Sequence, residues 1–114
     1  MSRASTVAAP QVRDAAPLFA ALGDETRLRL IARLSAGGPG SITQLSEKSA
    51  VTRQAISKHL RVLSGAGLVG STRRGRESVW ELKPKRLSDA HEYLDRISRQ
   101  WDDALDRLKG FVES

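Results

Sequence analysis

The sequence has no cysteine, few aromatic residues (two Trp, one Tyr and two Phe) and no long apolar run. Without cysteine, disulfides, thiolate metal sites and redox sensing by thiols are excluded. No apolar stretch approaches the roughly 20 residues that cross a bilayer. The N-terminus also lacks the basic region and apolar core of a signal peptide. We therefore expect a cytoplasmic protein that contacts no membrane and holds no cofactor.

The length of 114 residues, 39% of them hydrophobic, fits one domain with a real core. Residues 1–11 are rich in Ser and Ala and show no periodicity, so we expect a flexible N-terminal tail. Residues 12–114 are expected to form a single domain that includes the C-terminal helix.

The net charge of +6 is unevenly distributed along the chain. Residues 1–47 carry +1, with five Arg/Lys and four Asp/Glu. Residues 48–86 carry ten Arg/Lys and two Glu, hence +8, and residues 87–114 carry four against seven, hence −3. Such segregation is typical of proteins that bind a polyanion.

The segment Val51–Arg61 and the residues after it predict a short helix with two unlike faces. Thr52 is expected to cap its start and to lie among the DNA-binding residues. Gly67 lies where a helix end requires positive φ. The polar face offers donors for phosphates and base edges. We expect base readout from Arg53, Gln54 and Ser57, and phosphate contacts from Lys58 and Arg61. His59 either touches a phosphate or caps the polar face.

Two helices are predicted before this segment, over Ala15–Leu22 and Glu25–Leu34. Pro17 is tolerable in a first turn, and Asp24 is a good N-cap for the second helix. In the second helix we expect Leu28, Ile31, Ala32 and Leu34 to face inward and Arg27, Arg29 and Arg33 to face outward.

Ala36–Gly40 is predicted to be a loop, and Ser41–Ser49 a short helix with Thr43 as a possible N-cap. Ala50 and Val51 then form a tight turn into the polar helix. A helix, a short turn and a second helix with a polar face form the helix-turn-helix pattern. The polar helix is therefore interpreted as a recognition helix.

Two β-prone runs follow, Leu68–Arg74 and Glu77–Leu82, around a turn centred on Gly75. Like charges crowd the predicted tip, at Arg73, Arg74 and Arg76. Because such charges repel unless an anion neutralises them, the hairpin is interpreted as a wing that contacts DNA phosphates. Trp80 is expected to pack in the core beside Leu82.

The chain ends in one long predicted helix after Pro84. Its apolar residues recur every three or four positions: Leu87, Ala90, Leu94, Ile97, Trp101, Ala104, Leu108 and Phe111, widened by Leu105 and Val112. This is an unbroken heptad seam. A helix of about 39 Å cannot bury the whole stripe on so small a domain, so we expect a twofold dimer.

The sequence resembles the ArsR/SmtB-like winged-helix repressors over about residues 15–112. The resemblance is carried by residues 18–30 (LFAALGDETRLRL), residues 57–63 (SKHLRVL) and residues 66–69 (AGLV). It implies a mainly α winged helix-turn-helix fold with a small β-hairpin wing. It also implies a homodimer joined through the first and last helices, at Leu18, Phe19, Leu94, Ile97, Trp101, Leu105 and Leu108.

The metal chemistry of this family does not carry over. Its Cys-x-Cys positions align with Ser41 and Thr43, which are not soft-metal ligands. A second family site uses Asp-x-His, present here as Asp89 and His91, but the two partner ligands align with Asp102 and Leu105. Half a site would hold zinc poorly, so no metal is expected.

These patterns predict a sequence-specific DNA-binding regulator, a homodimer that represses transcription from an inverted-repeat operator. One alternative is a winged-helix interaction module that no longer binds DNA. Another is a metal-responsive repressor that uses Asp89 and His91. An enzyme is not expected, because neither His lies near a nucleophile motif or a phosphate loop. The trigger for release could be an organic ligand, a protein partner or nothing beyond autorepression.

Overall fold

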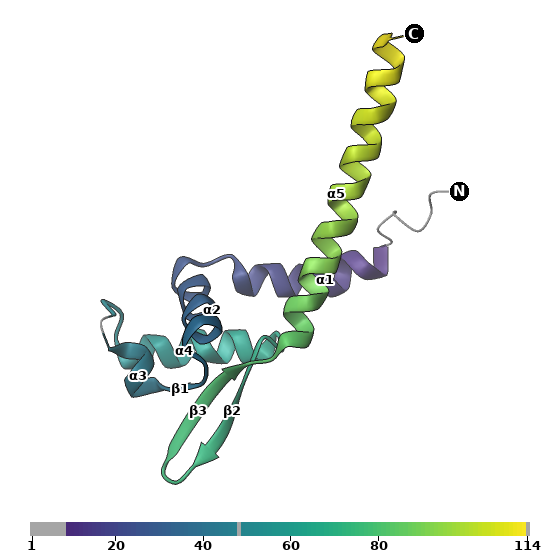
Figure 1. Ribbon diagram of the computed structural model, residues 1–114. Helices are drawn as coiled ribbons and strands as arrows, with labels where there is room; N and C mark the ends of the chain where they lie inside the picture. Colours follow the sequence, from purple (N-terminus) through teal and green to yellow (C-terminus); the bar gives the residue numbers. More distant parts are fainter. Residues whose placement is uncertain (1–8, 48, 114) are drawn as a thin grey trace.

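The computed structural model describes residues 9–47 and 49–113 of the chain (Figure 1). In chain order the elements are α1 (Ala9–Leu22), α2 (Glu25–Gly37), β1 (Gly40–Ser41), α3 (Ile42–Ser46), α4 (Arg53–Gly65), β2 (Val69–Arg74), β3 (Glu77–Leu82) and α5 (Pro84–Glu113). The predicted fold class is confirmed: the protein is mainly helical, with a helix-turn-helix followed by a β-hairpin wing.

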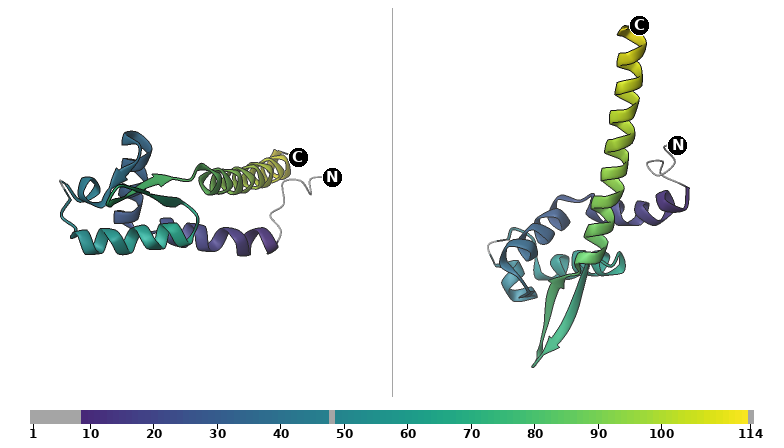
Figure 2. Two further views of the ribbon diagram at one scale, coloured as in Figure 1. Left: turned by 90° about the horizontal axis from the view of Figure 1, so that it is seen from below. Right: turned by 45° about the vertical axis from the view of Figure 1, so that its right-hand side comes forward.

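The molecule has two unlike parts, a body and a projecting rod. Helices α1 to α4 and the sheet form the body, and α5 runs away from it on the side opposite the wing (Figures 1 and 2). The molecule therefore measures 67 × 26 × 20 Å. α5 has 30 residues, about 45 Å at 1.5 Å per residue. Only its first turns lie against the body.

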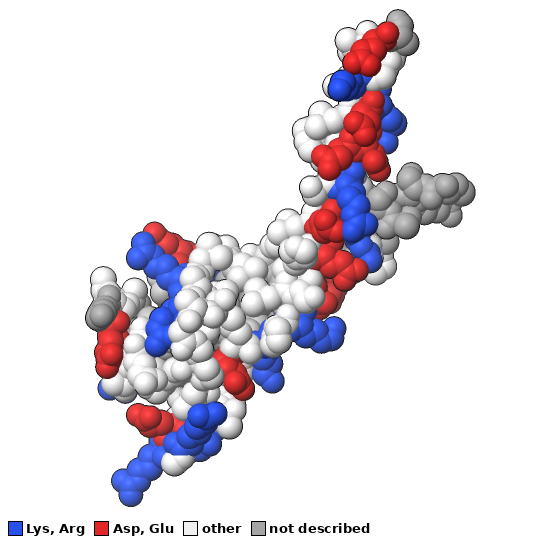
Figure 3. Space-filling model, viewed as in Figure 1, with Lys and Arg blue, Asp and Glu red and all other residues white. Residues whose placement is uncertain are grey.

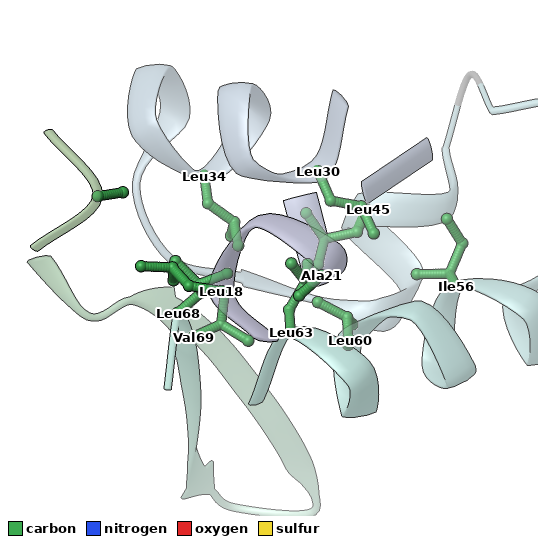
Figure 4. Close-up of a cluster of buried hydrophobic side chains, with 11 residues drawn as sticks. Leu18, Ala21, Leu30, Leu34, Leu45, Ile56, Leu60, Leu63, Leu68 and Val69 are labelled. Atoms are coloured by element: carbon green, nitrogen blue, oxygen red, sulfur yellow. The ribbon is translucent and has the colours of Figure 1, made fainter. Parts of the chain in front are cut away.

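The core of the body is made where α1, α2 and α4 meet the start of the wing (Figure 4). The most completely buried side chains, each at most 1% exposed, are those of Leu18, Ile56, Leu60, Leu63, Leu68 and Val69. They come from α1, from α4 and from the residues that lead into and begin β2. Apolar burial of this kind anchors α4 on its inner side and leaves its outer side exposed.

The sheet has three antiparallel strands in the order β1-β3-β2. The two strands of the wing lie where the β-prone runs predicted them. β1 was not predicted, since a strand of two residues has no readable periodicity. In β1, Gly40 pairs with Trp80 and Ser41 with Val79. Trp80 packs partly buried against the core, as expected.

The start of α3 differs from the prediction, which placed the cap at Thr43. Ser41 is the N-cap, and its Oγ accepts a hydrogen bond from the Gln44 backbone N–H at 3.2 Å. The Gln44 Oε1 in turn accepts a hydrogen bond from the Ser41 backbone N–H at 2.9 Å. This reciprocal capping box satisfies two donors at the helix start, which Thr43 alone could not do.

The prediction for the first helix is wrong in extent. α1 begins at Ala9 rather than Ala15, so Pro17 lies inside the helix. Proline there removes one intrahelical hydrogen bond, and the fold tolerates it because Leu18 and Ala21 are buried in the core. The flexible tail was expected over residues 1–11, but residues 9–11 are helical; residues 1–8 lie outside the described part of the chain.

Helix α2 keeps its predicted N-cap but is longer and rotated relative to expectation. It continues to Gly37 rather than Leu34, and Gly38 caps it at a φ of 73°. Leu28, expected to face inward, is 52% exposed. Arg27, expected to face outward, is partly buried against α4. Arg27 lies three and seven residues before the buried Leu30 and Leu34, hence on the same side of the helix.

In the part of the chain that the structure describes, no helix is both long enough and apolar enough to cross a membrane.

Candidate nucleic-acid interface

Helix α4 begins and ends as the sequence predicts. The Thr52 Oγ1 accepts a hydrogen bond from the Ala55 backbone N–H at 3.1 Å, which makes Thr52 the N-cap. At the other end Gly67 has a φ of 77°. The Leu68 N–H donates to the Leu63 carbonyl at 3.0 Å, and the Gly67 N–H donates to the Ser64 carbonyl at 3.0 Å. These two bonds form a Schellman motif, which gives the helix a defined end.

The outer side of α4 carries the side chains predicted to read DNA. Arg53, Gln54, Lys58 and Arg61 are exposed, and Ser57 is half-buried between them. An Arg61 guanidinium nitrogen lies 3.5 Å from the Ser57 hydroxyl, so the two form a pair across one turn. In the described chain none of the three cations forms an ion pair. This polar row on the outer side of α4 therefore offers positive charge that no ion pair compensates, beside the amide donor and acceptor of Gln54.

The wing carries the second group of cations. Arg73, Arg74 and Arg76 are all exposed at its tip, and within the described residues none of them forms an ion pair. Figure 3 shows this basic tip at the end of the molecule farthest from α5. Arg74 is in register with Glu77, and Gly75 makes the turn with a φ of 64°. Arginines held on a short hairpin are placed to contact phosphates.

Two of the predicted DNA-binding residues have internal roles. The hydroxyl of Thr52 caps α4, as described above. His59 lies on the other side of α4 from Ser57 and Arg61, because two residues along a helix are separated by about 200°. Its Nδ1 lies 3.1 Å from the Arg27 guanidinium and 3.7 Å from the Asp24 carboxylate. His59 is thus partnered within the protein, away from the polar row.

Arg27 joins three helices at this point, and the sequence interpretation missed it. Its Nε donates to the Ala21 carbonyl at the end of α1 at 2.6 Å, and its Nη1 contacts His59 on α4. Its backbone N–H donates to the Asp24 carboxylate at 3.0 Å. This last bond is the main cause that lowers the pKa of Asp24 below its ordinary value of 3.8. The sequence did hold a signal for this role, because Arg27 lies three residues before the buried Leu30 and hence on the same side of α2.

The residues proposed as half a metal site are not brought together as ligands. Asp89 accepts a hydrogen bond from Arg86 at 2.8 Å, and Arg86 also donates to Asp14 on α1 at 3.1 Å. These bonds, first to Asp89 and then to Asp14, raise the pKa of Arg86 above its ordinary value. His91 is exposed. Among residues 9–47 and 49–113, no three His, Asp or Glu side chains are grouped so as to hold a metal ion.

The predicted interface residues on α5 form an exposed apolar seam beyond the body. The exposed fractions are 53% for Leu94, 40% for Ile97, 64% for Trp101, 45% for Leu105 and 60% for Leu108. A tryptophan and three leucines at this exposure on one helix are unusual for a monomeric surface. We call these five residues the α5 seam.

The two interface residues predicted on α1 behave differently. Leu18 is 1% exposed and lies within the core (Figure 4). Leu18 therefore packs within its own chain, and its predicted place in a dimer interface stays a prediction. Phe19 packs on Tyr93 of α5, with ring centroids 5.6 Å apart. This contact and the Arg86–Asp14 pair join α1 to the first turns of α5.

A helix-turn-helix with an exposed polar second helix, followed by a basic two-stranded wing, defines a winged-helix DNA-binding protein. Residues 22–71 match a family model described as "Helix-turn-helix domain". The solved ArsR-like transcriptional regulator from Rhodococcus sp. RHA1 is 35% identical with a TM-score of 0.78, covering 90% of this chain and 95% of that one.

Curated relatives agree with this class. The HTH-type transcriptional regulator Rv2034 of Mycobacterium tuberculosis is 36% identical over 82% of this chain and 84% of its own length. The HTH-type transcriptional repressor SmtB of the same species is 30% identical over 83% of this chain and 69% of its own length. The chain belongs to the ArsR/SmtB family of transcriptional regulators, a family of DNA-binding proteins and not of enzymes.

Proposed function

We propose that the protein is a homodimeric repressor that binds an imperfect inverted repeat in double-stranded DNA. The observation that carries the proposal is the set of six exposed cations on α4 and the wing. They are Arg53, Lys58, Arg61, Arg73, Arg74 and Arg76, and within the described chain none of them forms an ion pair. DNA phosphates would neutralise these cations, and the counterions condensed on the duplex would be released.

The division of labour within this surface follows from position. Arg53, Gln54 and Ser57 lie in the first turns of α4, the part of a recognition helix that reaches base edges. Gln54 has the donor and acceptor that match the major-groove edge of adenine. Lys58, Arg61 and the wing arginines would hold phosphates and set the register.

The dimer is proposed on the α5 seam. Pairing two α5 helices would cover Trp101 and Leu108, and it would place two copies of α4 on one side of the assembly with twofold symmetry. Such a pair would enter successive major grooves about 34 Å apart, which requires half-sites about one helical turn apart. The SmtB relative is named a transcriptional repressor, which favours repression over activation.

The test is capture of genomic DNA fragments by the purified protein, followed by gel shifts on the enriched sequences and sedimentation of the free protein. We expect a dimer, and enriched fragments that share an inverted repeat. Reporter transcription from an enriched promoter should fall when the protein is supplied. A protein that sediments as a monomer, or that enriches no sequence at low ionic strength, contradicts the proposal. The latter result would favour an interaction module.

A further inference from the structure

The recognition helix is held to the body in two ways that differ in kind. Its inner side buries Ile56, Leu60 and Leu63, each at most 1% exposed. Apolar burial is strong but non-directional, so it tolerates small rotations of the helix about its axis. A hydrogen bond is directional and restricts that rotation.

Within the described part of the chain, one side-chain hydrogen bond joins α4 to another helix: the contact between His59 and Arg27. The guanidinium of Arg27 is itself fixed, because its Nε donates to the Ala21 carbonyl at 2.6 Å. Ala21 belongs to α1, which also packs on α5 through Phe19 and Tyr93. The chain of contacts therefore runs from α5, through α1, to the side of α4 opposite Ser57 and Arg61.

We propose that Arg27 is a positioning residue that sets the orientation of α4 in the DNA groove, with His59 as its acceptor. The inference rests on the proposed DNA-binding function and adds to it a residue that does not touch DNA. Because a guanidinium nitrogen can only donate, this contact is a hydrogen bond when His59 Nδ1 is unprotonated and the ring proton lies on Nε2. The Asp24 carboxylate, 3.7 Å from the same Nδ1, is the other charged group facing the ring.

The central variant is Arg27→Lys. Lysine keeps the charge but cannot donate to Ala21 and His59 at once in the geometry of a planar fork. We expect affinity for a captured duplex to fall about tenfold, the effect of one hydrogen bond to a charged group. Affinity for a scrambled duplex of equal length should stay within about twofold, because the net charge is unchanged.

Arg29→Lys is the matched control. Arg29 lies two residues further along α2, is 78% exposed and pairs with Glu25 at 3.0 Å. The same substitution there should leave both affinities unchanged. Thermal unfolding of each variant is measured in parallel, so that a loss of specific binding in a fully folded protein is separated from a loss of fold.

Variants of His59 give a second, independent measurement. In His59→Asn the amide oxygen can occupy the place of Nδ1 and accept from Arg27, whereas His59→Leu offers no acceptor. We expect His59→Asn to keep specific binding within about threefold and His59→Leu to lose about tenfold. In the Arg27→Lys background the two His59 variants should bind alike, because the contact they probe is already lost.

Nitrogen NMR of the free protein at pH 8 reads the tautomer directly. We expect His59 with an unprotonated Nδ1 in the wild type and a mixture of tautomers in Arg27→Lys.

A proton on Nδ1 in the wild type overturns the proposal, as does equal weakening of captured and scrambled duplexes by Arg27→Lys. A wild-type protein that prefers no sequence would overturn the proposed function and the positioning role together. If the wild type does discriminate but Arg27→Lys behaves like Arg29→Lys, the positioning role alone fails.

Discussion

The basic end of the molecule and the α5 rod leave different groups without partners. On α4 and the wing, the arginines and lysines are exposed and form no ion pair with the described residues. On α5, Arg86, Arg96 and Arg99 are each paired with a carboxylate within four residues. The larger apolar side chains are distributed in the opposite way. Ile56, Leu60 and Leu63 of α4 are buried in the core, whereas the α5 seam is exposed.

This contrast indicates two partners of different chemistry. Charge that the chain does not compensate attracts a polyanion. Charge that is compensated locally, beside an uncovered apolar stripe, suits an apolar surface of similar shape, which a second copy of α5 provides. The substitutions below test the contrast, from the largest expected effect to the smallest.

Trp101→Lys should have the largest effect. A lysine ammonium in the middle of the α5 seam would have to be buried without a partner on association. We expect dimerisation to weaken at least about a hundredfold and specific DNA binding to weaken with it. Sedimentation equilibrium measures the first and gel shifts the second.

Asp103→Lys adds the same residue to the exposed acidic side of α5 and is the control for Trp101→Lys. It should leave the dimer intact. A Trp101→Lys protein that still sediments as a dimer would show that the seam is not the interface.

Gln54→Ala tests sequence reading by the basic end. Loss of a bidentate base contact costs about 1–3 kcal/mol. Affinity for the captured duplex should fall by that amount, whereas affinity for scrambled DNA should be unchanged. Competition binding with single-base variants of the captured site should locate the position at which preference is lost. Equal weakening on all duplexes would remove Gln54 from base readout.

Arg74→Ala tests phosphate binding by the wing. We expect a smaller and uniform loss, with the slope of log affinity against log salt reduced by about one. Titrations at several salt concentrations measure that slope. Arg99→Ala removes an arginine paired with Asp95 on α5 and should leave the slope unchanged. A loss confined to the captured duplex would assign Arg74 to base reading instead.

Asp24→Asn should have the smallest effect, confined to stability at acid pH. The folded protein lowers the pKa of Asp24 below 3.8, so the ionised carboxylate stabilises the fold above that pH. This contribution is lost as the pH falls through the folded value. Asn remains a good N-cap, so only the charge is removed.

Denaturant unfolding between pH 3 and pH 7 measures this effect. The stability difference between the wild type and Asp24→Asn should shrink toward the acid end of that range. A difference that does not depend on pH would mean that the cap, and not the charge, stabilises α2.

Much of the basic end could be predicted because its signals are local. Thr52, the Gly67 turn and the wing strands all depend on residues within a few positions of one another. The α5 seam was predictable for the same reason, since a heptad repeat is a property of one helix.

The errors share a different origin. β1 exists because Gly40 and Ser41 pair with residues about 40 positions later. The family resemblance placed Leu18 at an interface, but its position among α2, α4 and β2 buries it in the core of its own chain. Arg27 was assigned to the surface because arginine usually lies there. Burial of its guanidinium is possible only because Ala21 and His59 supply acceptors.

The sequence by itself therefore determined the class of the protein: which segments are helical, which helix is polar on its outer side, and where the cations gather. Local spacing and charge carry that information. Only the tertiary structure decided which of those residues remain available to a partner. It buried Leu18, turned His59 toward Arg27 and left the seam uncovered, because each outcome depends on contacts between helices that lie far apart in the chain.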